Sequence, residues 1–142
     1  MEINFYFEQG ITLNNRKGLK QFIASLFKQE GKGLSVLTYI FCSDEYLLNI
    51  NRQYLGHDYY TDIISFDLSE TKAGPTIGEI YISTDRIKEN AKGLKVSIEQ
   101  EIHRVIFHGA LHLCGYKDKT KSQQKTMRSK ENFFLIKYGF VL

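Results

Sequence analysis

The chain has 142 residues, of which 42% are hydrophobic and 25% are charged. This length and composition fit one folded globular domain and exclude a disordered, collagen-like or proline-rich chain. The net charge of +3 is unevenly divided: residues 1–70 hold six basic and nine acidic residues, whereas residues 71–142 hold thirteen basic and seven acidic ones. The charge pattern leads to the hypothesis that the C-terminal half faces a polyanion.

Three sequence features bear on the cellular compartment. The first ten residues, MEINFYFEQG, contain the acidic Glu2 and no basic residue, so they do not predict a secretion signal. The longest apolar stretch, about Val36–Cys42, is far shorter than the roughly 20 residues that span a bilayer. Cys42 and Cys114 are distant in the sequence, and we expect two reduced thiols in a cytoplasmic protein.

Strands and helices are expected to alternate in the first half of the chain. Met1–Phe7 alternates apolar and polar residues, which is typical of a strand. Leu34–Cys42 is apolar and rich in β-branched and aromatic residues, which favours a buried strand. Capping residues and helically spaced apolar residues predict two helices, one from Asn14-Asn15 to Gly31 and one from Ser43 or Asp44 to about Tyr54.

The second half is expected to begin with two strands and to end with three helices. The strands are Asp62–Leu68 and Ile77–Ser83, separated by a loop at residues 69–76. The helices run from Thr84 or Asp85 to about Lys92, ended by Gly93; from Ile98 to Leu113, behind a Ser97–Gln100 capping box; and from Lys121 to Tyr138. This order predicts a single α/β (α+β) domain, residues 1–142, with a mixed sheet of about four strands and about five helices.

His108 and His112 are the clearest chemical signal in the sequence. Four residues apart on the predicted helix, their imidazoles lie one turn apart on one face, a spacing that chelates a metal ion. Gly115 follows the helix and lets the chain turn back, so that Asp118 supplies a third ligand. Two histidines and one carboxylate leave a position for water, as in a catalytic site. Cys114 points to another side of the helix and is expected to pack against the fold.

The residue after the first histidine argues against a zinc peptidase. The ligand spacing resembles the metzincin pattern, but such a peptidase needs a glutamate where this chain has Gly109. Glu101 lies about 10 Å farther along the helix axis, too far to replace that base, and is expected to be a first-turn acid. His103 and His57 are expected to be surface histidines, and His57 is also a candidate substrate contact.

Three segments of the chain resemble the YbeY family of bacterial endoribonucleases. His108–Asp118, which reads HGALHLCGYKD, resembles the family pattern H-G-x-L-H-L-x-G-Y-D-H. Asn51–Phe66 resembles N-x-x-Y-R-x-x-D-x-x-T-D-V-L-S-F, and Gly78–Ser83 resembles G-D-I-x-I-S. The segments occur in the family's order, and together their positions extend over most of the chain.

The resemblance implies a zinc-dependent single-strand endoribonuclease that acts in 3′-end maturation of small-subunit ribosomal RNA and in ribosome quality control. It implies one Zn²⁺ per chain on His108, His112 and Asp118, with a metal-bound water and no assigned side chain as the catalytic group. The family usually has histidine in the third place, and a carboxylate is an acceptable zinc ligand there. Ribosomal RNA and ribosomal particles are the expected partners, the cytoplasm is the expected location, and no membrane is involved.

The positive charge around the site departs from the family pattern. The family's arginine in the Y-R-G stretch is Leu55 here, and leucine cannot bind a phosphate. Arg52, about one helical turn earlier, is a candidate catalytic replacement, and a solvated helix arginine fits it equally well. A basic run follows the metal motif and extends to Arg128 and Lys130. Its RNA-binding candidates are Lys117, Lys119, Lys121 and Lys125.

Two other functions stay open at this point. The first is a ribosome-assembly module that binds RNA, with a structural metal and weak or lost catalysis, and Leu55 favours it. The second is another small metallohydrolase, such as a peptidase, against which Gly109 argues. Cleavage of single-stranded RNA that depends on His108 separates the nuclease hypothesis from both.

Overall fold

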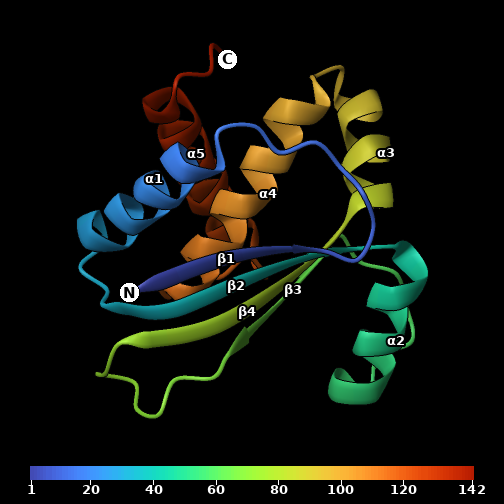
Figure 1. Ribbon diagram of the computed structural model, residues 1–142. Helices are drawn as coiled ribbons and strands as arrows, with labels where there is room; N and C mark the ends of the chain where they lie inside the picture. Colours follow the sequence, from blue (N-terminus) through green and yellow to red (C-terminus); the bar gives the residue numbers. More distant parts are fainter.

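The computed structural model describes residues 1–142 and contains one sheet and five helices (Figure 1). In chain order the elements are β1 (Glu2–Phe7), α1 (Arg16–Gln29), β2 (Leu34–Cys42), α2 (Asp44–Leu55), β3 (Ile63–Asp67), β4 (Thr76–Ser83), α3 (Thr84–Leu94), α4 (Ile98–Leu113) and α5 (Lys121–Tyr138). The expected α/β fold with a four-stranded mixed sheet and five helices is confirmed.

The sheet has the strand order β1-β2-β4-β3. The pairs β1–β2 and β2–β4 are parallel, because the chain between the strands of each pair makes a crossover that includes a helix. β3 pairs with β4 in the antiparallel direction, with Ser65 opposite Ile80. β3 is therefore an edge strand, and it contacts α4, the helix that carries the two candidate ligand histidines.

Helices α1, α4 and α5 cover one face of the sheet (Figure 1). Ile80 from the sheet, Ile106 from α4 and Phe134 from α5 belong to one buried hydrophobic cluster. The buried hydroxyl of Tyr39 on β2 donates a hydrogen bond to the Ile106 carbonyl at 2.9 Å, which ties α4 to the sheet. Ten of the sixteen residues of α4 are buried, so this helix is fixed in position by its packing.

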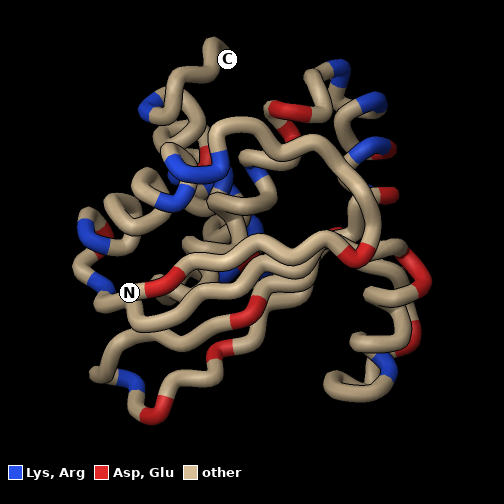
Figure 2. Tube along the Cα trace, in the orientation of Figure 1, with Lys and Arg blue, Asp and Glu red and all other residues tan.

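Helix α2 packs on the opposite face of the sheet. Leu47 of α2 forms a smaller buried cluster with Cys42 and Ile64. The first turn of α2 contains Asp44 and Glu45, where negative charge favours a helix N-terminus. Figure 2 shows mostly acidic positions at this corner of the molecule, whereas Lys and Arg positions gather on α1 and α5. The two faces of the sheet therefore differ in charge.

The prediction that Gly93 ends the third helix is wrong. α3 continues through Gly93 to Leu94, and the capping residue Lys95 adopts a left-handed conformation with φ 57°. The backbone N–H of Val96 donates to the Ala91 carbonyl at 3.0 Å and closes the last turn. A glycine inside a helix costs only about 1 kcal/mol relative to alanine, and the packing of α3 against α4 outweighs that cost.

The two cysteines are free thiols, as the sequence predicts. Cys42 and Cys114 form no disulfide, and Cys114 packs against the main core. Burial raises the pKa of each thiol to about 12, so both stay protonated at neutral pH. No helix in the structure combines the length and the apolar character that crossing a membrane requires.

Candidate metal centre

The three predicted metal ligands meet at the C-terminal end of α4. The ring centroids of His108 and His112 are 4.5 Å apart. Gly115 adopts φ 106°, which few other residues tolerate, and it follows the helix where the chain reverses. The Oδ2 atom of Asp118 consequently lies 3.2 Å from Nε2 of His108 and 3.3 Å from Nε2 of His112. Ligand atoms of the three residues lie within 4.8 Å of one another, close enough to share one ion.

Each histidine is held through its other ring nitrogen. Nδ1 of His108 lies 2.5 Å from Oε2 of Glu131 on α5, and Nδ1 of His112 lies 2.9 Å from the Tyr116 carbonyl oxygen. Both partners are acceptors, so each ring donates from Nδ1, and the tautomer with the proton on Nδ1 carries a lone pair on Nε2 for a metal. Two imidazole nitrogens and the Asp118 carboxylate form a donor set that suits zinc.

Glu131 belongs to a buried group of charges behind His108. Its side chain is 2% exposed, and its Oε1 atom lies 3.2 Å from Nη1 of Arg104 on α4. Arg104 also donates hydrogen bonds to both carboxylate oxygens of Glu101. Burial alone would raise the pKa of Glu131, but the hydrogen bond with His108 and the neighbouring arginine charges lower it. Glu131 is therefore ionised at neutral pH and accepts the proton of the His108 ring.

A cavity of about 640 Å³ opens beside the ligand cluster. One side of it comes from residues 61–67, on and before β3, and the other from α4 and α5. The hydroxyl of Ser65 is buried and has no hydrogen-bond partner within the protein, so it is available to a polar ligand. The charged groups in the lining are Asp62, Asp67, Asp118, Arg104 and Arg128.

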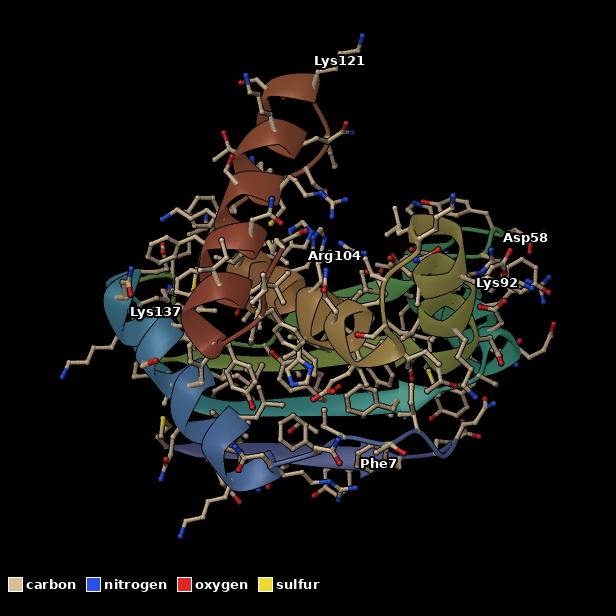
Figure 3. The ribbon with its side chains drawn as sticks, turned by 90° about the horizontal axis from the view of Figure 1, so that it is seen from above. Phe7, Asp58, Lys92, Arg104, Lys121 and Lys137 are labelled. Atoms are coloured by element: carbon tan, nitrogen blue, oxygen red, sulfur yellow. The ribbon has the colours of Figure 1, made fainter.

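The other sequence candidates lie outside this cavity. Arg52 on α2 pairs with Asp58, with 2.5 Å between Nε and Oδ1. Leu55, at the end of the same helix, is 43% exposed and also lies outside the lining, and His57 is exposed in the loop that follows. Lys121 points away from the body of the molecule at the start of α5 (Figure 3). The cavity lining contains none of the lysine candidates Lys117, Lys119, Lys121 and Lys125.

Gly109 explains why no peptidase base stands next to the first histidine. A Cβ atom at this position would lie 2.9 Å from Cδ1 of Ile80 and 3.0 Å from Cδ1 of Ile63. The position therefore faces β4 and β3, and a glutamate there would collide with the sheet. The structure adds a steric reason to the chemical argument against a peptidase.

The expectation of a surface position for His103 is wrong. His103 is 1% exposed: its Nδ1 lies 2.6 Å from the Glu99 carbonyl, and its ring packs against Tyr138 and Phe140. Burial lowers the pKa of His103 and outweighs the hydrogen bond to the backbone of Glu99. The expectation for His103 failed because the end of α5 and the C-terminal segment, which are distant in the sequence, cover this position. Glu101 lies in the first turn of α4, as expected; it is also buried, at 1% exposed, and forms an ion pair with Arg104.

Sequence reasoning missed the roles of Glu131 and Arg104. Arg104 lies one turn before His108, and this spacing was an available signal that both side chains share a face of α4. Glu131 is 23 residues away from its histidine partner. Only the packing of α5 on α4 brings Glu131 to His108. The one weak signal in the sequence was that Glu131 is an acidic residue in an otherwise basic helix.

Comparisons with known proteins point to one family. The family model described as Endoribonuclease YbeY matches residues 4–139. The chain is 46% identical over 130 residues to a protein of Christiangramia forsetii named Endoribonuclease YbeY, covering 92% of this chain and 90% of that protein. It is 47% identical over 133 residues to the Cytophaga hutchinsonii protein of the same name, covering 92% of each. The solution structure of TM1509 from Thermotoga maritima is similar with a TM-score of 0.68 and 27% identity, over 97% of this chain and 89% of that one.

Proposed function

Because the chain belongs to the YbeY family of endoribonucleases, we propose that the cluster of His108, His112 and Asp118 is the centre at which it cleaves RNA. Family membership makes the chain an endoribonuclease, a hydrolase of phosphodiester bonds. The observation that carries the proposal is the placement of three metal-ligand side chains together in the lining of the 640 Å³ cavity.

One zinc ion per chain is the proposed cofactor. His108 and His112 would hold it through Nε2 and Asp118 through its carboxylate, because the Nδ1 atoms are engaged elsewhere. When bound, zinc supplies a Lewis acid that activates water and offsets negative charge on a phosphate. A carboxylate in the third place adds one negative charge and shifts the site's preference toward harder ions.

The chain's own groups orient these ligands. Glu131 and the Tyr116 carbonyl fix the planes and tautomers of the two imidazoles, so that little side-chain freedom is lost when a metal binds. The Asp62 and Asp67 carboxylates in the cavity repel a phosphate, so a cation must balance them. The unpartnered Ser65 hydroxyl offers a hydrogen bond to a polar substrate group.

The proposed substrate is single-stranded ribosomal RNA. The three segments that resemble the family support a role in 3′-end maturation of small-subunit ribosomal RNA and in ribosome quality control, with ribosomal particles as partners in the cytoplasm. The proposed contacts of the RNA backbone outside the cavity come from the loop and helix that follow the ligand motif. They are Lys117, Lys119, Lys121 and Lys125.

Cleavage of a single-stranded RNA by the purified protein tests the proposal, with zinc measured in the same samples. We expect the wild type to cleave, removal of zinc to stop cleavage, and returned zinc to restore it. The variant His108→Ala should lose both zinc and cleavage. Unchanged cleavage by zinc-free His108→Ala would contradict the proposal. A wild type that binds ribosomal particles without cleaving any RNA would favour the binding-module alternative.

A further inference from the structure

The cavity beside the ligand cluster needs a positive group for its substrate. Its lining holds three aspartates and two arginines, Arg104 and Arg128, and no lysine. An RNA phosphate that enters this space meets the negative field of the aspartates, which falls off slowly in a partly enclosed site. Apart from the proposed zinc, only the two arginines of the lining carry a positive charge that can bind it.

Arg104 is not free. Its side chain is 13% exposed and lies between two carboxylates, each about 1–2% exposed. It donates to both oxygens of Glu101 and, through Nη1, to Oε1 of Glu131 at 3.2 Å. Removing a guanidinium from such partners would leave buried carboxylates unpaired, which is costly. Figure 3 shows Arg104 on α4 beside α5, consistent with a residue that joins the two helices.

Arg128 is in the opposite situation. Its side chain is 53% exposed, and its one ion pair joins Nη1 to Oε1 of Glu131 at 3.4 Å, an oxygen already engaged by Arg104. It donates no hydrogen bond within the protein, so its Nε and Nη2 groups remain available. A guanidinium with free donors binds two phosphate oxygens at once, which a lysine cannot do.

Helix α5, which carries Arg128, also orients the proposed metal ligand His108. Glu131 lies three residues later on α5, and residues at this spacing share a helix face. That face holds the His108 ring through Glu131 and directs Arg128 into the same cavity. The remaining basic candidates lie outside the lining of the cavity. Arg52 pairs with Asp58, and the others are Lys117, Lys119, Lys121 and Lys125.

We propose that Arg128 binds a phosphate of the RNA beside the ligand cluster, as the cavity's free cation. This inference rests on the proposed function, because it takes RNA as the substrate of the cavity.

Binding of a non-cleavable oligonucleotide tests the assignment. The zinc-loaded protein is titrated into a fluorescent 2′-O-methyl RNA at several salt concentrations, and the anisotropy is measured. Replacement Arg128→Ala should raise Kd by about tenfold, the loss of one charge-assisted contact. It should also reduce the slope of log K against log salt by about 0.7, the value for one phosphate contact on a single strand. Arg128→Lys should keep the slope and lose part of the affinity.

Lys137→Ala is the matched control. It removes one positive charge from the other end of α5, where Lys137 lies outside the cavity (Figure 3). Zinc content and thermal midpoint of each variant show that the fold and the ligand cluster are intact. We expect Lys137→Ala to match the wild type in Kd and slope. Equal Kd and slope for Arg128→Ala and Lys137→Ala would overturn the assignment, whether or not the wild type cleaves RNA. Failure of the wild type to cleave a natural RNA tests the proposed function separately.

Discussion

Among the single residues of the site, Glu131 has a buried carboxylate that contacts a proposed metal ligand and two arginines. It accepts the His108 proton, lies against Arg104 and Arg128, and is 2% exposed. Groups behind a metal ligand fix its tautomer and orientation, and their loss typically weakens metal binding 10- to 100-fold. The strength of metal binding should thus depend on a residue that never touches the ion.

Glu131→Gln tests this role. Glutamine keeps the size of the side chain but accepts the His108 proton less strongly and leaves Arg104 with less negative charge. We expect zinc affinity, measured by competition with a chelating dye, to fall by roughly 10- to 100-fold. Glu89→Gln on the exposed side of α3 is the control, because the Glu89 side chain is 74% exposed and lies only near Arg86. Equal zinc affinity of the two variants would show that Glu131 does not orient the ligand.

The buried His103 is expected to make the free energy of unfolding depend on pH. Burial lowers its pKa in the folded protein below the unfolded value of about 6.5. The unfolded chain therefore binds the proton more readily, and the stability that neutral His103 contributes is complete above about pH 6.5 and is lost as the pH falls toward the folded pKa. In urea unfolding at pH 7.5 and pH 5.5, His103→Gln should lose less of its free energy of unfolding on acidification than the wild type does. Parallel losses would exclude His103 as a source of acid sensitivity.

At the scale of elements, the ligand motif depends on how closely α4 approaches the sheet. Gly109 and Gly78 leave room for this approach: a Cβ at Gly78 would lie 2.6 Å from Cδ1 of Leu113. These close contacts hold the end of α4 that carries His108 and His112. The glycine beside the first histidine is therefore a packing requirement as well as the absence of a catalytic base.

Substitution of two helical glycines separates the effect of core packing on stability from the effect of helix propensity. Gly109→Ala places a methyl group 2.9 Å from Ile80 and should lower the free energy of unfolding by about 1–3 kcal/mol, as overpacked cores do. Gly93→Ala on α3 has no neighbour within 4 Å and should raise it by about 0.5–1 kcal/mol, since alanine favours helix. Urea unfolding of both variants gives the comparison. A stabilised Gly109→Ala would show that α4 is free to move away from the sheet.

The sequence predicts the features that depend on local spacing, but not those that depend on how the helices pack. His108, His112 and Asp118 lie within eleven residues, on one helix and the turn after it, so local spacing alone brought them together. The cap at Ser97 predicted the start of α4 for the same local reason. Glu131 reaches the site only through the packing of α5 on α4, which no local pattern encodes. Gly93 misled the prediction because tertiary contacts override helix propensity.

At the scale of the whole molecule, the net charge of +3 says less than its distribution. Basic positions gather on α1 and α5, whereas the end of α2 nearest the sheet is acidic (Figure 2). The cavity itself holds more carboxylates than arginines. The arrangement favours an RNA that is attracted by the basic helices and then meets a locally acidic site, where the proposed zinc would offset the carboxylates.

Return of zinc to the metal-free protein shows whether the predicted ligand cluster and the RNA-cleaving centre are the same place. Cleavage of a single-stranded RNA is followed as zinc is added in steps to the wild type and to Asp118→Ala. We expect wild-type cleavage to rise from zero to a plateau at one zinc per chain, and Asp118→Ala to need much more zinc and to reach a lower rate. Full cleavage by the metal-free wild type, or an Asp118→Ala titration that matches the wild type, would contradict this expectation.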